Sequence, residues 1–364
     1  GQFVCTPKSA KRSVCQKSAE SLSVRPDAII NATGAWVDQT LSGLCRSSSS
    51  VDCGHDIEVG LIRGTKGSHI ILEDVSLRDA LGEDGIYAEA PDGRPIFLLP
   101  FAEEQVLVGT TDIPVQGDPG LARTDQSEVD YLIKAVSRIV PQCQLSGKNI
   151  VQHYCGVRPL PGPRVTGRAA GTPGSVTRRH LLLRDEGATI PTWSIVGGKL
   201  TTCRSLAEES VRKVFAELGF PIIDKNSQRV LPGCLYEEDR EACDSRTKNV
   251  AARSGIPEES IEAVSQWAVG LYGRRAPHVF ENMMQCSQAA MLPPLIGDSG
   301  LPTAAAVFAI EQEWALSLGD LIERRLMLIF HPQLSLATLH DLAEILVVMG
   351  CLQPADRESA VLSE

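Results

Sequence analysis

The pattern of apolar and polar residues divides the chain into a region of mixed strands and helices, up to about residue 220, and a helical region after it. In the first region, short apolar and β-branched runs bounded by glycine, proline and charged residues predict strands. The predicted strands cover residues 57–63, 66–72, 95–100, 105–108, 151–160 and 180–184. Short strands with glycine-rich and charged connections favour a largely antiparallel sheet in a substrate-facing domain.

Apolar residues at three- and four-residue spacing predict the helices. One helix covers residues 124–139, begins with a polar run that is typical of a capped helix start, and ends before Pro141. We interpret this helix as a packing element. Another runs from Leu200 to Gly219, where glycine is typical of a helix end. The C-terminal region is predicted to form a separate helical domain with helices at residues 245–254, 258–272, 304–330 and 336–349.

Two segments combine a strand, a small-residue turn and the start of a helix. The first is residues 27–38, where a β-branched run leads into Thr33-Gly34 and then into a helix that carries Trp36. A doubly wound sheet presents its carboxyl edge to a nucleotide with this order of elements. A plain strand-to-helix turn is the alternative interpretation.

The second segment contains a buried strand, a glycine pair and a helix start: Trp193-Ser194-Ile195-Val196-Gly197-Gly198-Lys199-Leu200-Thr201-Thr202. The glycines let backbone N–H groups approach a ligand, and the helix N-terminus carries partial positive charge. Thr201 and Thr202 offer a cap. The segment predicts an anion site with Lys199 at its mouth, on which Arg158, Arg178 and Arg204 could converge.

Three further polar groups can be interpreted either as functional or as ordinary structural residues. His69 begins an apolar strand, where it points either into a cleft or outward as a hydrogen-bonded edge residue. The run Gly109-Thr110-Thr111-Asp112 is typical of a turn after a strand. The longest predicted helix carries Glu311, Glu313 and Arg324-Arg325 among apolar positions, which indicates a salt-bridged helix face unless these residues are catalytic.

Composition narrows the class of protein. The 364 residues, 43% of them apolar, are enough for two or three domains with packed cores. The net charge of −10 argues against a general nucleic-acid surface, so no nucleic-acid partner is expected and local basic clusters become more informative.

The 11 cysteines have neither a zinc-binding nor a thioredoxin-type spacing, so no metal site is predicted and reduced thiols in the cytoplasm are expected. No apolar run approaches the length of a membrane span, and the N-terminal residues lack the apolar core of a signal peptide. Gly1 is not a natural start, which suggests that the sequence begins inside a longer protein.

An ordered set of six motifs resembles the FAD-dependent, aerobic-type glycerol-3-phosphate dehydrogenases. Each motif is weak alone, and the order and spacing make the resemblance specific over nearly the whole chain. The motifs are Asn31-Ala32-Thr33-Gly34-Ala35-Trp36, Lys66-Gly67-Ser68-His69, Gly109-Thr110-Thr111-Asp112, Gly156-Val157-Arg158-Pro159-Leu160, Val196-Gly197-Gly198-Lys199-Leu200-Thr201-Thr202 and Glu313-Trp314-Ala315 with Arg324-Arg325.

The resemblance implies an α/β fold plus a helical domain. We expect a partial FAD-binding, Rossmann-like domain at residues 1–43, a D-amino-acid-oxidase-like antiparallel substrate domain at 44–150, a return to the substrate and FAD domains at 151–220, and a helical domain at 221–364. The GxGxxG fingerprint with which family members begin is absent. We therefore expect a fragment of a longer enzyme, with a truncated, non-catalytic remnant or interaction fragment as the alternative.

The implied reaction oxidises sn-glycerol 3-phosphate to dihydroxyacetone phosphate, with hydride passing to FAD and electrons to quinone. The proposed catalytic residues are His69, Arg158 and Lys199, and these three together with Arg178 are expected to contact the substrate. His69 is the candidate base, because an ordinary imidazole pKa near 6.5 lies closest to working pH. FAD would be held through Thr33, Gly34, Trp36, Gly197, Gly198, Leu200, Thr201 and Thr202.

Quinone as the acceptor implies peripheral contact with the inner face of the cytoplasmic membrane. The sequence leaves the oligomeric state open, a homodimer included. A glycerol-3-phosphate oxidase that uses oxygen is the nearest alternative enzyme. An amine- or amino-acid-oxidising flavoprotein fits less well, because the cluster of arginine and lysine suits a phosphate dianion better than one carboxylate.

Overall fold

The computed structural model describes residues 3–5, 22–46, 60–101, 104–166, 179–186, 188, 190–222, 230–331 and 334–363. The chain forms two compact units, one of Arg25–Ile223 and one of Asp224–Glu364 together with Phe3–Val24. Two short strands, β1 (Phe3–Cys5) and β2 (Leu22–Val24), form an antiparallel pair. Each unit is described below by itself.

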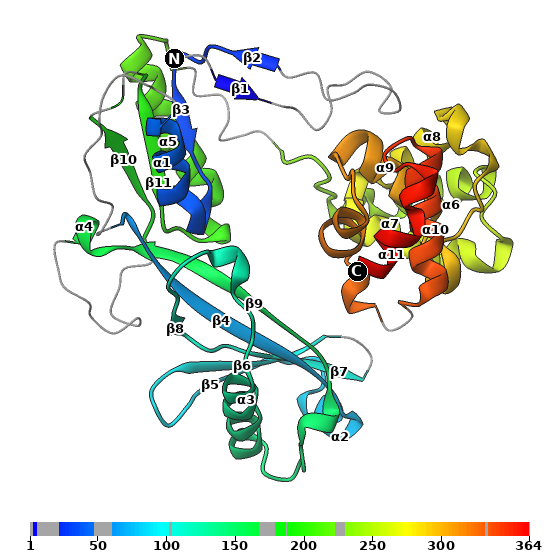
Figure 1. Ribbon diagram of the computed structural model, residues 1–364. Helices are drawn as coiled ribbons and strands as arrows, with labels where there is room; N and C mark the ends of the chain where they lie inside the picture. The colour runs from blue at the N-terminus through cyan, green and yellow to red at the C-terminus, as the bar shows by residue number, and fades with distance from the viewer. Residues whose placement is uncertain are drawn as a thin grey trace. The chain divides into compact units, whose positions relative to one another are not determined.

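The first unit contains a small mixed sheet in the order β10-β11-β3 (Figure 1). Its strands are β3 (Ile29–Asn31), β10 (Leu181–Asp185) and β11 (Thr192–Val196), with β3 and β11 parallel. Because they are parallel, the loops that follow β3 and β11 leave the same edge of the sheet. The helices α1 (Val37–Arg46) and α5 (Cys203–Leu218) continue from these loops.

Six antiparallel strands form the second sheet of this unit, in the order β5-β6-β7-β4-β8, with β9 on the other side of β4. The strands are β4 (Ile62–Glu73), β5 (Ile86–Glu89), β6 (Pro95–Pro100), β7 (Gln105–Gly109), β8 (Ile113–Pro114) and β9 (Ile150–Pro161). Figure 1 shows β4 and β9 as two long neighbouring ribbons.

One face of this sheet is covered by helices. Ile70 and Leu72 of β4 are fully buried in a core with Leu132 and Val136 of α3 (Gln126–Ile139). The helix α2 (Val75–Leu81) packs on the same core, and α4 (Pro163–Thr166) follows β9. Side chains alternate between the two faces of a strand, so Gly67 and His69 belong to the opposite face. We call it the open face because none of the described helices of this core packs on it and the Arg158 side chain is 28% exposed there, although Thr65 and Ile71 on this face are buried.

The second unit is helical, as the spacing of apolar residues predicts. Its helices are α6 (Glu237–Arg253), α7 (Ile261–Tyr272), α8 (Ala276–Gln285), α9 (Thr303–Glu313), α10 (Leu336–Val348) and α11 (Arg357–Ser363). Every residue of α9 from Thr303 to Ile310 is buried, which is typical of a central helix without a polar face. The core of this unit surrounds α9 and includes Phe280 of α8 and Leu342 of α10.

The predicted helix over residues 304–330 is wrong. The first helix, α9, ends at Glu313, and Trp314 has a left-handed backbone with φ 60°. A separate helical turn covers Asp320–Arg325, and the Asp320 carboxylate accepts hydrogen bonds from the backbone N–H groups of Leu316 and Ser317 at 3.1 Å each. This side-chain capping supports a second helix start, which a continuous apolar spacing does not reveal.

The strands predicted at 66–72, 95–100, 105–108, 151–160 and 180–184 are confirmed within a residue or two, except that the first belongs to the longer strand β4. The predicted break before Lys66 is wrong, because β4 continues through Gly64 and pairs with β9 along its whole length. Residues 57–59 of the first predicted strand lie outside the described residues. The helices α2, α4, α8 and α11 were not predicted.

Candidate active site

The open face of the six-stranded sheet brings together side chains from three of the sequence motifs. His69 of β4 lies opposite Gly109 of β7 and opposite Tyr154 of β9. Arg158 lies four residues beyond Tyr154 on β9, opposite Thr65, and therefore on the same face of the sheet. Residues directly opposite in antiparallel strands share a face, so the imidazole, the phenol and the guanidinium project from one surface.

Arg158 is held by the turn that follows β7. Its guanidinium donates to Oγ1 of Thr110 at 2.9 Å, to the carbonyl oxygen of Thr111 at 3.2 Å and to Oδ1 of Asp112 at 3.4 Å. A Cβ atom added to Gly67 would overlap with Nη1, Nη2 and Cζ of Arg158. Gly67 therefore provides the space in which the guanidinium lies.

Gly109 has the same relation to His69. A Cβ atom at Gly109 would overlap with Cδ2 of His69 and lie 2.7 Å from Nε2. The imidazole stacks on Tyr154 with ring centroids 4.9 Å apart and an interplanar angle of 11°. Its Nδ1 atom is buried and has no hydrogen-bond partner among the described residues.

Burial, and then the positive charge of Arg158, lower the pKa of His69 to about 4. The ordinary imidazole pKa near 6.5, on which the choice of His69 as the base rested, therefore does not hold at this position. The imidazole is neutral at pH 7 and can accept a proton, although it is a weaker base than an exposed histidine.

A buried carboxylate behind the sheet was missed by the sequence analysis. Glu128, in the first turn of α3, is 1% exposed and accepts hydrogen bonds from Lys66 at 2.6 Å, Ser68 at 2.8 Å and Thr111 at 2.7 Å. It also accepts from the backbone N–H of Asp125 at 3.1 Å, which completes a capping box. The helix was interpreted as packing alone, but Glu128 joins α3 to the two motifs that surround Arg158 and His69.

The hydrogen bonds decide the charge of Glu128. Burial acts to raise its pKa, but the bonds from Lys66, Thr111, Asp125 and Ser68 outweigh burial and hold the pKa below its usual value. Lys66 also donates to the carbonyl oxygen of Arg123 at 2.7 Å. Lys66 and Glu128 therefore form a buried, hydrogen-bonded ion pair. The hydrogen bond from Thr111 to Glu128 also fixes Thr111, whose carbonyl oxygen accepts from Arg158.

The two predicted cofactor loops leave one edge of the small sheet. Thr33 and Gly34 follow β3, and Gly197 and Gly198 follow β11, which is parallel to β3. Gly34, Gly197 and Gly198 have φ of 59°, 73° and 103°, a region that favours glycine. The strand, glycine pair and helix order predicted for residues 193–202 is confirmed, with a short turn at Leu200–Thr202 before α5.

The predicted threonine cap is wrong. Neither Lys199 nor Thr202 caps the following helical segment with its side chain, and Thr202 Oγ1 donates to the carbonyl oxygen of Lys199 at 3.1 Å. The side chains at these two cap positions therefore do not accept from the backbone N–H groups at the start of the helical segment. Leu200 is 88% exposed, and Lys199, Thr201 and Thr202 are exposed as well.

The remaining predicted site residues lie as follows. The indole N–H of Trp36 donates to Asp118 at 3.1 Å, and Thr33 Oγ1 donates to Asn31 at 2.6 Å. Arg204 forms an ion pair with Glu208 of its own helix at 3.6 Å. Arg178 lies outside the described residues.

These residues fit a flavin nucleotide along one side. Glycine backbones at the carboxyl edge of parallel strands, and a helix start whose N–H groups face solvent, are suited to the negative and hydrogen-bond-accepting atoms of a dinucleotide. A Cβ atom at Gly34 would meet nothing within 4 Å, so the backbone at Gly34 is open to a ligand.

The fold and this edge define a class of protein, and comparison with known families agrees. The family model described as FAD-dependent oxidoreductase matches residues 8–189, half of the chain. The chain belongs to the FAD-dependent oxidoreductase family, as the sequence analysis predicted. A second model, the C-terminal domain of alpha-glycerophosphate oxidase, matches residues 227–349.

Within this family, the chain is similar to glycerol-3-phosphate dehydrogenases. It is 32% identical to the glycerol-3-phosphate dehydrogenase of Synechocystis sp. over 82% of this chain and 50% of the relative. It is 34% identical to the aerobic glycerol-3-phosphate dehydrogenase of Escherichia coli over 58% of this chain and 39% of the relative. The chain thus spans about half the length, or less, of these curated relatives.

A solved structure has the same fold. The glycerol-3-phosphate dehydrogenase from Bacillus halodurans, complexed with FAD, matches with a TM-score of 0.68 and 21% identity. The match covers 95% of this chain and 62% of the solved one. The predicted fold class, a D-amino-acid-oxidase-like FAD-binding fold with an antiparallel sheet and a helical C-terminal domain, is confirmed.

Proposed function

We propose that the chain supplies the substrate face and one side of the flavin site of an enzyme that oxidises sn-glycerol 3-phosphate to dihydroxyacetone phosphate. The names of the relatives, both glycerol-3-phosphate dehydrogenases, support this substrate. In this proposal residues 1–43 and 151–220 contribute to the FAD-binding domain, residues 44–150 to the substrate domain, and residues 221–364 form the helical domain.

The observation that carries the proposal is the pair of functional side chains on the open sheet face. Arg158 offers a planar fork of donors that matches a phosphate dianion. His69 is neutral and lies close enough to Arg158 for the guanidinium charge to lower its pKa. Each side chain occupies space left by a glycine, Gly67 or Gly109, on a neighbouring strand.

The reaction must separate a proton and a hydride from the secondary alcohol. Arg158, Arg178 and Lys199 would bind the phosphate and hold the alcohol in register, and His69 would accept the hydroxyl proton as the carbonyl forms. When bound, the flavin accepts the hydride from the carbinol carbon. Thr33, Gly34, Trp36 and the segment Gly197–Thr202 would hold that cofactor.

Two electron acceptors remain candidates. The relatives are named dehydrogenases and not oxidases, which favours an acceptor other than oxygen, and quinone is the acceptor that we propose. The match of residues 227–349 to the C-terminal domain of alpha-glycerophosphate oxidase favours oxygen as the second candidate. Quinone reduction implies peripheral contact with the inner face of the cytoplasmic membrane, and the described residues include no helix long and apolar enough to cross a bilayer.

The test combines the purified chain with FAD and follows the flavin absorption bands without oxygen. We expect bound FAD, bleaching of its bands by glycerol 3-phosphate, and recovery of the bands when a soluble quinone is added. Hydrogen peroxide release in air, with no response to quinone, would identify the oxidase. An Arg158→Gln variant should bind FAD and resist bleaching.

Failure of the chain to bind FAD would support the alternative that it is a truncated, non-catalytic remnant and not part of an active enzyme. A chain that binds FAD and is not reduced by glycerol 3-phosphate would contradict the proposed substrate. Sedimentation with anionic vesicles tests the proposed membrane contact, and light scattering determines whether the chain is a monomer or a homodimer.

A further inference from the structure

The helical unit contains a cavity of about 710 Å³ that plays no part in the proposed reaction. Its wall is formed by the loop at Pro232–Gly233, the end of α7 and the residues on either side of the helix break after α9. Arginine is the most frequent charged residue of the lining: Arg240, Arg275, Arg324 and Arg325 accompany a single glutamate, Glu313. In a chain of net charge −10, four arginines in the lining of one cavity stand out.

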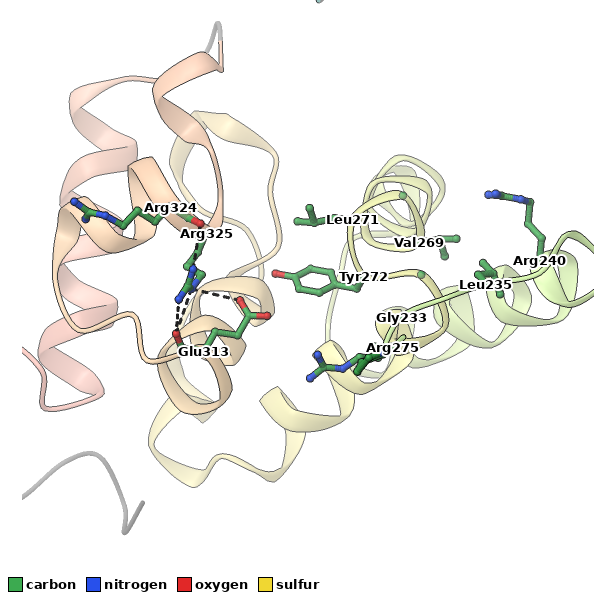
Figure 2. Close-up of a pocket in the computed structure, with 13 residues that line it drawn as sticks. Gly233, Leu235, Arg240, Val269, Leu271, Tyr272, Arg275, Glu313, Arg324 and Arg325 are labelled. Carbon is green, nitrogen blue, oxygen red and sulfur yellow. Dashed lines mark hydrogen bonds and ion pairs between the residues drawn. The ribbon is translucent and has the colours of Figure 1, made fainter. Parts of the chain in front are cut away.

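Two of these arginines already have protein partners. Arg324 forms ion pairs with Asp320 at 3.1 Å and Glu323 at 3.4 Å, and Figure 2 shows its guanidinium on the side away from Tyr272. Arg240 forms an ion pair with Glu237 at 3.0 Å. Both are fixed near the cavity with much of their charge compensated.

A third arginine, Arg325, is also partnered. It donates twice to the backbone carbonyl oxygen of Glu313, at 2.8 and 3.2 Å, and forms a long ion pair with the Glu313 carboxylate at 3.8 Å. Arg275 has neither a carboxylate within 4.0 Å nor a hydrogen-bond acceptor among the residues that the structure describes, and its guanidinium lies 5.2 Å from the ring centroid of Phe308. The planar donor group of Arg275 is therefore available to a ligand.

Tyr272 supplies an independent indication of a ligand. Its side chain is 8% exposed, yet its hydroxyl has no hydrogen-bond partner among the described residues. Figure 2 shows the ring extending toward Glu313 and Arg325, with the guanidinium of Arg275 below the ring in this view. Burial raises the pKa of this phenol, so the hydroxyl stays protonated and can donate a hydrogen bond.

The two donor groups are held in place by one aromatic ring. Tyr272 packs edge to face on Phe308 with centroids 5.6 Å apart, and Arg275 lies over that same ring. Gly273, between them in sequence, has φ 54° and runs against the backbone of Gly233, where a Cβ atom would overlap with the Gly233 carbonyl oxygen. The donors are thus positioned before any ligand binds.

We propose that this cavity binds a phosphate-bearing small molecule, with the Arg275 fork and the Tyr272 hydroxyl donating to the phosphate oxygens. The positive charge of Arg325 favours a dianion, and the apolar wall at Leu235, Val269 and Leu271 accommodates the organic part. The volume is in the range of small-molecule sites, which is about 300–1,000 Å³. None of these residues is among the proposed flavin and substrate residues, so this inference does not depend on the proposed function.

The test is calorimetric titration of the full chain with inorganic phosphate at constant ionic strength. All variants carry Arg158→Gln, so that phosphate binding at the sheet face does not contribute. We expect one saturable site, at least tenfold weaker affinity with Arg275→Gln or Tyr272→Phe, and unchanged affinity with Arg274→Gln. Arg274 is the matched control, because it is exposed, adjacent and outside the lining.

Tyr272→Phe also separates a ligand role from a structural one. It keeps the ring that packs on Phe308 and removes a buried hydroxyl without a partner among the described residues. Without phosphate, the variant should therefore have a higher melting temperature than its parent, and added phosphate should raise that temperature by less. Absence of saturable binding in the Arg158→Gln chain, or equal affinity in the Arg275→Gln and Arg274→Gln variants, would overturn the proposal. Should Arg275→Gln fail to fold, equal phosphate affinity in Tyr272→Phe and its parent would overturn it too.

Discussion

Replacing Gly67 with alanine should displace the guanidinium of Arg158 while leaving the arginine itself in the sequence. The added methyl group would occupy the space of the guanidinium, so Arg158 must leave its three partners at 2.9, 3.2 and 3.4 Å. The end of an arginine side chain moves easily, and Gly67 does not have a left-handed backbone, so the strand itself should tolerate alanine. The main effect of the substitution should therefore be a displaced guanidinium and not a distorted strand.

The magnitudes predict a separation between stability and binding. Loss of the three Arg158 bonds should cost about 1–2 kcal/mol, because the group is partly solvated, and replacing a strand glycine should return about 0.5–1 kcal/mol. The free energy of unfolding should thus change by only about 1 kcal/mol. Loss of the positioned fork should weaken glycerol 3-phosphate binding by about 2 kcal/mol, or roughly 30-fold.

The assay is calorimetric binding of glycerol 3-phosphate to the FAD-loaded chain, together with urea unfolding. Gly156→Ala controls for the strand effect, because Gly156 lies directly opposite Gly67 and its added methyl group would meet nothing within 4 Å. In an Arg158→Gln background, Gly67→Ala should weaken binding no further. Wild-type affinity in Gly67→Ala, or an undiminished effect in that background, would refute the assignment of Arg158 as the phosphate ligand.

Three further predictions concern the groups around this site. Glu128→Gln should lower the free energy of unfolding by about 3 kcal/mol, because Lys66 stays buried and keeps only the exposed Asp125 carboxylate, at 3.5 Å, as its counter-charge. Urea unfolding should show much of this loss recovered in Glu128→Gln with Lys66→Met. The pKa of His69 is lower in the folded chain, about 4, than its ordinary 6.5, so its contribution is complete above about pH 6.5 and declines as the pH falls toward 4. His69→Gln should flatten the dependence of unfolding free energy on pH in that window, and equal slopes in the two proteins would contradict the burial of the imidazole. Gly198→Ala should cost about 1–2 kcal/mol, because φ is 103°, and should weaken FAD binding measured by flavin fluorescence; an unchanged affinity would remove this loop from the cofactor site.

Local signals in the sequence were sufficient for the cofactor edge. The run at 193–202 contains its own strand, glycine pair and helix start within ten residues, so no distant contact is needed to predict it. The same holds for β9 and for the end of α5 at Gly219, whose φ is 73°. Prediction failed where distant residues decide the outcome.

Glu128 and Trp314 illustrate these failures. Glu128 looks like an ordinary first-turn glutamate, and its burial depends on Ser68, which is 60 residues away in sequence. The apolar spacing continues past Trp314, but Arg325 donates to the carbonyl oxygen of Glu313 and satisfies an acceptor that a continuous helix would have used. Glu313 and Arg325 therefore meet across a helix break, and not along one helix face.

The single strand β4 explains why Lys66-Gly67-Ser68-His69 combines such different residues. Gly67 and His69 face the open side of the sheet, where one leaves space for Arg158 and the other stacks on Tyr154. Lys66 and Ser68 face α3 and both bond to Glu128. Glu128 in turn fixes Thr111, and the carbonyl oxygen of Thr111 accepts from Arg158. Residues on both faces of one strand therefore act on one guanidinium, so a substitution behind the sheet should alter substrate binding as well as stability.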